Sequence, residues 1–276
     1  MLEICKAVLF GIVEGITEWL PISSTGHMIL LNEFVKLQVS PEFWEMFLVV
    51  IQLGAIIAVV LLYWNRIFPF SFDGGEVLRK DVFSMWGKVI IGCLPAVIIG
   101  LPFDDLFEEL FYNYKMVAVA LIVFGVAFIV IENKNKGKKP KIHSIKELTL
   151  QAAFIIGIFQ LIAGIFPGTS RSGATIVGAL LIGVSRTAAA EFTFFMAIPV
   201  MFGASLLKIL KFVMEGVQIG GMEWAILLTG CIVAFAVSVV VIKFLMNYIR
   251  KNDFKVFGWY RIVLGILVLA YFMLQP

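Results

Sequence analysis

Two glutamates near the start of the chain have the spacing of a paired acidic site. Glu14 and Glu18 are four residues apart, so on a helix their carboxylates share one face. The surrounding stretch is apolar, and a charge held in hydrocarbon costs several kcal/mol unless it is paired or hydrated. A divalent cation, a shared proton or the guanidinium of Arg171 would compensate them. Alternatively, both side chains reach out to the lipid headgroups.

A proline-broken polar loop follows these glutamates. Ser23, Ser24 and Thr25 place three hydroxyls in a row after Pro21, and the next helix is expected to start there. The free N–H groups and the positive dipole end of a helix favour phosphate, whereas helix capping alone explains one hydroxyl of the three. Histidine is the side chain that titrates near neutrality, which makes His27 a candidate base.

A second polar loop follows Pro167 in the other half of the chain. Residues 168–173 offer two glycines, three hydroxyls and Arg171. An arginine fork matches phosphate oxygens in a bidentate way and stays charged, so this loop is predicted to cradle phosphate. Alternatively, Arg171 only neutralises Glu14 or Glu18. We predict that the two loops bind substrate through Ser23, Thr25, Gly168, Thr169, Ser170 and Ser172.

The elements that must position these loops are membrane-spanning helices. Of 276 residues, 61% are hydrophobic and only 15% are charged, against roughly a quarter charged in soluble domains. A span takes about 20 mostly apolar residues, and six are predicted, at 43–64, 85–101, 116–131, 192–210, 224–241 and 258–274. The glutamates interrupt the N-terminal apolar stretch, which is therefore interpreted as structure rather than as a signal peptide. The three cysteines lack the spacing of a zinc site or a disulfide framework and are interpreted as packing residues.

An internal repeat relates the two loops. Residues 11–21 align with 157–167, and at the same offset Ser24 meets Ser170 and Thr25 meets Arg171. Each half has three full spans after its broken segment, and an odd number of crossings turns the second half upside down. The predicted fold is an all-α polytopic membrane protein with two inverted-topology repeats, each a re-entrant helix pair plus three transmembrane helices. It forms a single membrane domain, 1–276, with repeat one at 1–132, a basic cytoplasmic linker at 133–147 and repeat two at 148–276.

Charge in the loops predicts the orientation. Lysine and arginine in short loops mark the cytoplasmic side, and they gather in 65–83, 133–147 and 243–257, whereas 104–109 is acidic. Both termini and the first polar loop are then expected on the outer side. His143 lies in the basic linker and is expected to be solvated. Arg186 and Glu191 are interpreted as a structural ion pair or as interface anchors, and the same applies to Glu45.

The sequence resembles a known family at both loops. Residues 14–27 look like the first signature of the undecaprenyl-pyrophosphate phosphatase, or bacitracin-resistance, family, and 167–173 resemble its second. Residues 51–55 and 185–192 also fit, so the resemblance covers most of the chain. Trp19 stands where phenylalanine is expected. The resemblance implies a bacterial inner-membrane, multi-pass enzyme that hydrolyses undecaprenyl pyrophosphate to the monophosphate and inorganic phosphate, recycling the carrier lipid for peptidoglycan synthesis.

The family's functional residues can be carried over position by position. The resemblance implies that the catalytic residues are Glu14, Glu18, Ser24, His27 and Arg171. It also implies a divalent cation, Mg²⁺ or Ca²⁺, that Glu14 and Glu18 help to hold. Two routes stay open: Ser24 attacks phosphorus with His27 as base, or His27 or a glutamate activates water. The expected partners are a polyprenyl pyrophosphate lipid and the bilayer, with no nucleic acid and a possible homodimer.

Three other functions compete with this reading. Inverted repeats with broken helices are also the architecture of secondary transporters and lipid flippases. The type-2 phosphatidic acid phosphatase superfamily uses a histidine nucleophile and a second histidine, but His143 lies far from His27 in the sequence. A purely structural membrane role would leave the charges beside the polar loops without compensation.

Overall fold

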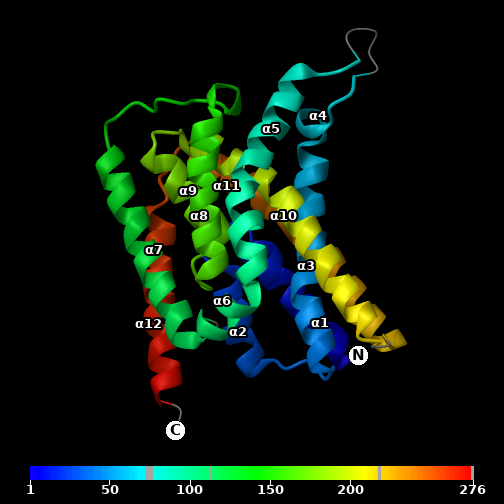
Figure 1. Ribbon diagram of the computed structural model, residues 1–276. Helices are drawn as coiled ribbons and strands as arrows, with labels where there is room; N and C mark the ends of the chain where they lie inside the picture. The colour runs from blue at the N-terminus through cyan, green and yellow to red at the C-terminus, as the bar shows by residue number, and fades with distance from the viewer. Residues whose placement is uncertain (72–76, 112, 217–218, 275–276) are drawn as a thin grey trace.

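The computed structural model describes residues 1–71, 77–111, 113–216 and 219–274, and it is helical almost throughout (Figure 1). Six of its helical segments are long and apolar enough to cross a membrane. They confirm the six predicted spans, with bounds a few residues wider at most ends. They are α3 (Pro41–Leu62), α5 with the turns that extend it (Lys80–Phe103), α7 (Tyr114–Asn135), α10 (Arg186–Met214), α11 (Gly221–Ile249) and α12 (Lys255–Leu274).

Polar caps explain why some helices exceed their apolar cores. The third span was predicted at 116–131, yet α7 has 22 residues. The side chain of Asn113 caps this helix, since its Oδ1 accepts a hydrogen bond from the Met116 N–H at 3.0 Å. Ser40 and Ser185 cap α3 and α10 in the same way. Cap residues supply partners for the first N–H groups of a helix, and hydropathy does not detect them.

Two short helix pairs do not follow the pattern of the long helices. The first pair is α1 (Leu2–Thr17) and α2 (Ser24–Phe34), and the second is α8 (Leu150–Ile165) and α9 (Arg171–Leu181). A helix of 16 residues is about 24 Å long, shorter than the roughly 30 Å of a hydrocarbon core. In Figure 1, α1 and α2 lie toward the end with both termini, and α8 and α9 lie toward the opposite end.

Each pair starts and finishes on the same side of the molecule. The N–H of Gln38, just after α2, donates to Glu3 Oε2 at the start of α1 at 2.8 Å. The N–H of Lys141, before α8, donates to the carbonyl of Gly183, just after α9, at 2.8 Å. Each pair is therefore a hairpin whose turn is one of the two proline-broken loops.

Glycines let each hairpin pack against a long helix of the other half of the chain. A Cβ on Gly11 of α1 would lie 2.7 Å from the carbonyl oxygen of Gly230 in α11. A Cβ on Gly157 of α8 would lie 2.2 Å from the carbonyl oxygen of Gly92 in α5. Small residues allow such close backbone approach between membrane helices. The first hairpin thus packs against α11 of the second half, and the second hairpin packs against α5 of the first half.

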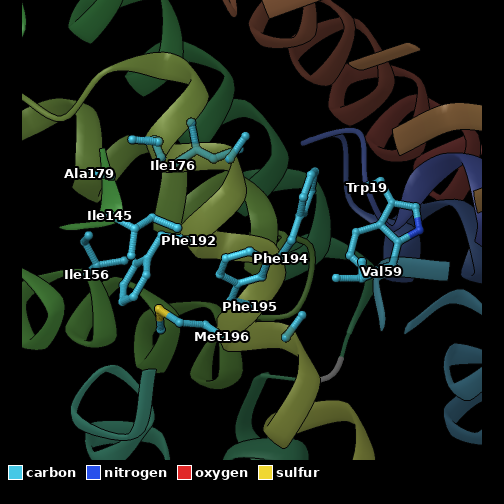
Figure 2. Close-up of a cluster of buried hydrophobic side chains, with 14 of the residues drawn as sticks. Trp19, Val59, Ile145, Ile156, Ile176, Ala179, Phe192, Phe194, Phe195 and Met196 are labelled. Carbon is cyan, nitrogen blue, oxygen red and sulfur yellow. The ribbon is translucent and has the colours of Figure 1, made fainter. Parts of the chain in front are cut away.

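Trp19, beside the first broken loop, lies at one edge of the main hydrophobic core (Figure 2). Trp19 is fully buried, and its ring packs edge-on against Phe194 of α10 at 5.3 Å between centroids. Phe192, Phe195 and Met196 continue this cluster. The core therefore fixes the first loop beside α10. The cysteines are free: Cys93 and Cys231 pack inside as predicted, whereas Cys5 is exposed, so its interpretation as a packing residue is wrong.

Ion pairs near the ends of α10 connect it to other helices. Arg186 donates to both Glu132 oxygens, at 2.8 and 2.5 Å, and Arg66 donates to Glu191 at 2.6 Å. The expected pair between Arg186 and Glu191 is therefore wrong, because five residues on a helix turn two side chains about 140° apart. Glu45 forms an ion pair, as expected, with Lys208 at 2.7 Å.

Candidate active site

Each broken loop turns at a serine with an unusual backbone. Ser23 has φ 75° and Ser170 has φ 69°, the only positive φ values among the described residues other than glycine. The Oγ of Ser23 accepts from the Gly26 N–H at 3.3 Å, and that of Ser170 from the Gly173 N–H at 3.1 Å. Such backbones cost about 1–3 kcal/mol and gather at functional sites. The two serines are helix caps, so capping does account for one hydroxyl of the first loop.

The caps correct the predicted alignment of the loops by one residue. Ser23 is equivalent to Ser170, so Ser24 corresponds to Arg171, each the first residue of its helix. The sequence alignment had placed Ser24 opposite Ser170, which is wrong. The physical reason is an extra residue between proline and cap in the second loop. The two loops therefore match at the caps of the helices that follow them, whereas the number of residues between proline and cap differs.

The carboxylate of Glu18 joins the two loops. The Ser24 hydroxyl donates to Glu18 Oε2 at 2.7 Å, and Arg171 Nη2 donates to Glu18 Oε1. The Ser172 hydroxyl donates to the backbone carbonyl of Glu18 at 3.1 Å. Charge-assisted hydrogen bonds of this kind are the strong ones. The predicted compensation by Arg171 therefore falls on Glu18, and Ser24 has a carboxylate in position to take its proton.

Three buried polar atoms beside this cluster have no hydrogen-bond partner in the protein. They are Glu14 Oε1, Thr169 Oγ1 and Arg171 Nη1. Glu14 is 1% exposed, and it precedes Glu18 by one helical turn. Buried polar groups are nearly always paired in native proteins, so unpaired groups of opposite charge on α1 and at the start of α9 are typical of a ligand-binding centre. An anionic ligand suits Arg171 Nη1, and a cation suits Glu14.

A cavity of about 510 Å³ opens onto these loops, within the usual size of ligand sites. Ser24 and Thr25 at the start of α2 and Pro167 of the second loop line it, together with Glu14 of α1 and Gly164 of α8. Thr25 is thus placed where a substrate-binding residue is expected. The hydroxyls of Ser23, Ser170 and Ser172 are instead committed to caps and to bonds between the loops. The remaining walls combine apolar side chains with Glu45, Gln52, Lys208 and Lys211.

Comparison with known proteins identifies the family. Residues 7–267 match the model of the family described as bacitracin resistance protein BacA. The chain belongs to the BacA family. An undecaprenyl-diphosphatase of Desulfitobacterium hafniense is 66% identical over 272 residues, which cover 99% of this chain and 97% of that protein. Undecaprenyl-diphosphatase 1 of Clostridium acetobutylicum is 65% identical over 99% of this chain and 98% of its own length. Both the family and the full-length match agree with the resemblance seen at the two loops.

In this BacA protein, His27 forms its hydrogen bonds with Ser23 and Tyr260, whereas Ser24 bonds Glu18. The Nδ1 of His27 lies 2.7 Å from the Ser23 carbonyl, which only accepts, so Nδ1 carries the proton. Nε2 then accepts from the Tyr260 hydroxyl at 2.7 Å. The two rings stack with centroids 5.6 Å apart. His27 therefore fixes the start of α2, while a direct role as the base for Ser24 stays a prediction.

Arg261 of α12 is a residue of the BacA site that sequence reasoning missed. It is fully buried and donates to the carbonyls of Thr169 at 2.7 Å, Gly168 at 3.0 Å and Pro21 at 3.2 Å. These hydrogen bonds connect Arg261 to the backbone of both loops. The available signal was an ionisable residue inside the predicted apolar span 258–274, because such a residue at membrane depth is a functional candidate by default. Tyr260, the preceding residue in the same apolar span, was also missed.

The expected cation fits the BacA site only together with substrate. The described residues hold no group of three or more His, Cys, Asp or Glu side chains suited to a metal. Glu14 has an unpaired oxygen, whereas both oxygens of Glu18 are engaged by Ser24 and Arg171. Mg²⁺ and Ca²⁺ take six or more oxygen ligands. Glu14 would supply one carboxylate to such a cation, and substrate oxygens and water would be needed to complete the shell.

Proposed function

We propose that this protein hydrolyses undecaprenyl diphosphate to undecaprenyl phosphate and inorganic phosphate. The observation that carries the proposal is the hydrogen bonding of Ser24 and Arg171 to Glu18 across the two loops, with Ser24 lining the cavity. This arrangement supports roles for Ser24 as nucleophile, for Glu18 as the acceptor of its proton and for Arg171 as the phosphate-binding cation. The names of the full-length relatives support the same activity. Recycling of the carrier lipid for cell-wall synthesis would follow.

The preferred mechanism begins with the Ser24 hydroxyl. Glu18 Oε2 takes the proton as Ser24 Oγ attacks the terminal phosphorus. A phosphoserine forms as the bond from that phosphorus to the bridging oxygen breaks, and undecaprenyl phosphate leaves with that oxygen. Glu18 passes this proton to the departing lipid phosphate. Water then attacks the phosphoserine and gives a proton to Glu18, which returns it to Ser24 Oγ as inorganic phosphate leaves. The competing route is direct attack by water, with Glu18 or His27 as base.

Charge stabilisation is assigned to three groups. Phosphoryl transfer depends mainly on positioning and neutralisation of charge. Arg171 has an Nη1 without a protein partner, and it would bind a phosphate oxygen while Nη2 holds Glu18. The first N–H groups of α2 and α9 favour an anion at their start. Glu14, whose Oε1 has no protein partner, would hold a divalent cation that supplies further positive charge beside the phosphate oxygens.

We also propose inverted repeats with re-entrant hairpins. The hairpins α1–α2 and α8–α9 have matching caps at Ser23 and Ser170. Their packing also matches, because Gly11 meets Gly230 while Gly157 meets Gly92. A pseudo-twofold axis would place each hairpin against a long helix of the other half in this way. Non-helical backbone at membrane depth is tolerated where protein or a wet cavity surrounds it, and both loops satisfy this condition.

The active site is proposed to open to the outer side of the inner membrane. The basic segments are tied together: Lys88 donates to the Ile145 carbonyl at 2.9 Å, and Lys146 lies 3.4 Å from Asp81. Arg186 begins α10 beside this region, and Lys208 lies about 33 Å further along the same helix. The cavity mouth is therefore on the face opposite the basic one. Lysine-rich short loops face the cytoplasm.

Phosphate release from a purified sample tests the function. The protein in detergent, with Mg²⁺ or Ca²⁺, should release inorganic phosphate from undecaprenyl diphosphate. A chelator should stop the release and added cation should restore it. If folded protein with cation releases no phosphate, the enzyme proposal fails, and movement of lipid across vesicles would then favour a transporter or flippase. Cross-linking in membranes tests the possible homodimer.

A further inference from the structure

Two lysines line the outer part of the catalytic cavity. Lys208 and Lys211 are three residues apart on α10, so they share a face of the helix, and both line the cavity that contains Glu14 and Ser24. Glu14 is buried, whereas Lys211 is exposed. The lysines therefore lie at the mouth and the glutamate at the inner end. A lysine in the last turn of a helix complements the dipole, but this does not account for two on the wall of one cavity.

The two lysines differ in their partners. Lys208 Nζ lies 2.7 Å from Glu45 Oε2, and the Glu45 side chain is 60% exposed. Such exposed ion pairs contribute only about 0–1 kcal/mol, so an incoming anion can replace Glu45. The side chain of Lys211 has no hydrogen bond or ion pair with any residue that the structure describes. Lys211 is therefore free to bind an anion at once.

The charge of the cavity requires such a site. Apart from the lysines, its charged lining groups are Glu14 and Glu45, and the adjacent Glu18–Arg171 pair is balanced. A diphosphate would meet a net negative surface on entry. Apolar walls from Leu48, Leu101 and Leu207 reduce screening and lengthen the reach of every charge. Positive charge at the mouth offsets this repulsion.

We propose that Lys208 and Lys211 form an outer phosphate-binding subsite, with Glu45 as its exchangeable internal partner. The subsite captures the terminal phosphate of the entering diphosphate and receives inorganic phosphate on its way out. This inference rests on the proposed function, because it assigns the same cavity a second phosphate position. Its ligand chemistry is a phosphate-bearing anion, either lipid-linked or free.

Steady-state phosphate release tests the subsite with the purified full-length protein in detergent. Lys208→Ala/Lys211→Ala should raise KM for undecaprenyl diphosphate by roughly three- to tenfold, with a smaller change in kcat. The inhibition constant of added inorganic phosphate should rise in parallel if the product uses the same position. A rise in KM alone would assign the subsite to the lipid-linked phosphate. Lys208→Arg/Lys211→Arg should restore both constants, because charge is retained.

Matched variants separate this inference from folding and from the activity itself. Lys115 is exposed near the start of α7 and is not part of the cavity lining, so Lys115→Ala should behave as wild type. Glu45→Gln should lower KM because it frees Lys208. An unchanged KM in both the double alanine variant and Glu45→Gln overturns the subsite, as does a loss confined to kcat. Absence of phosphate release from the wild-type protein would instead overturn the proposed function.

Discussion

Ser24 and Arg171 occupy the same position in their respective helices, and both donate a hydrogen bond to the carboxylate of Glu18. The helices α2 and α9 thus start in the same way with different side chains. One presents a hydroxyl and the other a guanidinium. Because both side chains bond one carboxylate, the proposed nucleophile and the proposed phosphate-binding group are held in place before substrate arrives, which would reduce the entropy cost of the reactive geometry.

Ser24→Ala should lower kcat by at least about a hundredfold if Ser24 is the nucleophile. The measurement is phosphate release, together with a search for phosphate on Ser24 after rapid quenching. Ser238→Ala is the control, since Ser238 is a buried serine of α11 outside the cavity lining. A Ser24→Ala variant that keeps most of its turnover would establish direct attack by water.

Glu18→Ala and Arg171→Ala should each abolish nearly all activity, and their effects should not add. Either change breaks the ion pair and disturbs the remaining partner. The double variant should therefore be as active as the less active of the two single variants. Arg171→Lys should recover little activity, since an ammonium cannot bind carboxylate and phosphate through one planar fork. Additive losses in this double-mutant cycle would show that Glu18 and Arg171 act separately.

Glu14→Gln should raise the cation concentration that gives half-maximal activity. The substitution keeps the shape of the side chain and removes the charge of an oxygen that has no protein partner. The readout is phosphate release over a Mg²⁺ or Ca²⁺ titration. Glu42→Gln, at an exposed position in the first turn of α3, should leave the titration curve unchanged. An equal loss of activity at every cation concentration would argue against a cation at Glu14.

Arg261→Met should destabilise the protein and reduce activity, although Arg261 is not placed to touch substrate. The variant leaves the carbonyls of Pro21, Gly168 and Thr169 without a donor, at about 1–3 kcal/mol for each buried group. A lower melting temperature in detergent should accompany the loss of activity, and Arg261→Lys should recover part of both. Arg250→Met, at an exposed site, provides the control. A stable, active Arg261→Met protein would contradict this role.

A cysteine at Lys36 should react with a membrane-impermeant reagent in intact cells, and one at Lys136 only after permeabilisation. Lys36 follows α2 and Lys136 ends α7, and both are exposed. The three native cysteines must first be replaced. The opposite labelling pattern would reverse the proposed orientation and place the cavity mouth on the cytoplasmic side.

The spans and the chemical residue types were predictable because they depend on local sequence. A run of apolar residues is enough to define a membrane helix, and all six predicted spans correspond to long helices. Proline and hydroxyl residues likewise located both broken loops near Ser24 and Arg171. The exposed position of His143 also follows from its place in a lysine-rich segment.

The pairing of side chains was decided by tertiary structure. Ser24 bonds Glu18 while His27 bonds Tyr260, although His27 is nearer to Ser24 along the chain. Arg186 bonds Glu132 rather than Glu191, because helical phase directs the two side chains to different neighbours.

The sequence by itself therefore determined a six-span membrane protein with two polar loops, since burial in lipid demands a local excess of apolar residues. Only the tertiary structure decided that Arg261 forms hydrogen bonds with the backbone of both loops and that Glu18 accepts a hydrogen bond from Arg171 across them. Those contacts bring together residues that lie far apart in the sequence, and they depend on the packing of α12 and on the exchange of hairpins between the halves. A hydrogen bond has a range of about 3 Å, so small shifts in packing decide which partners meet.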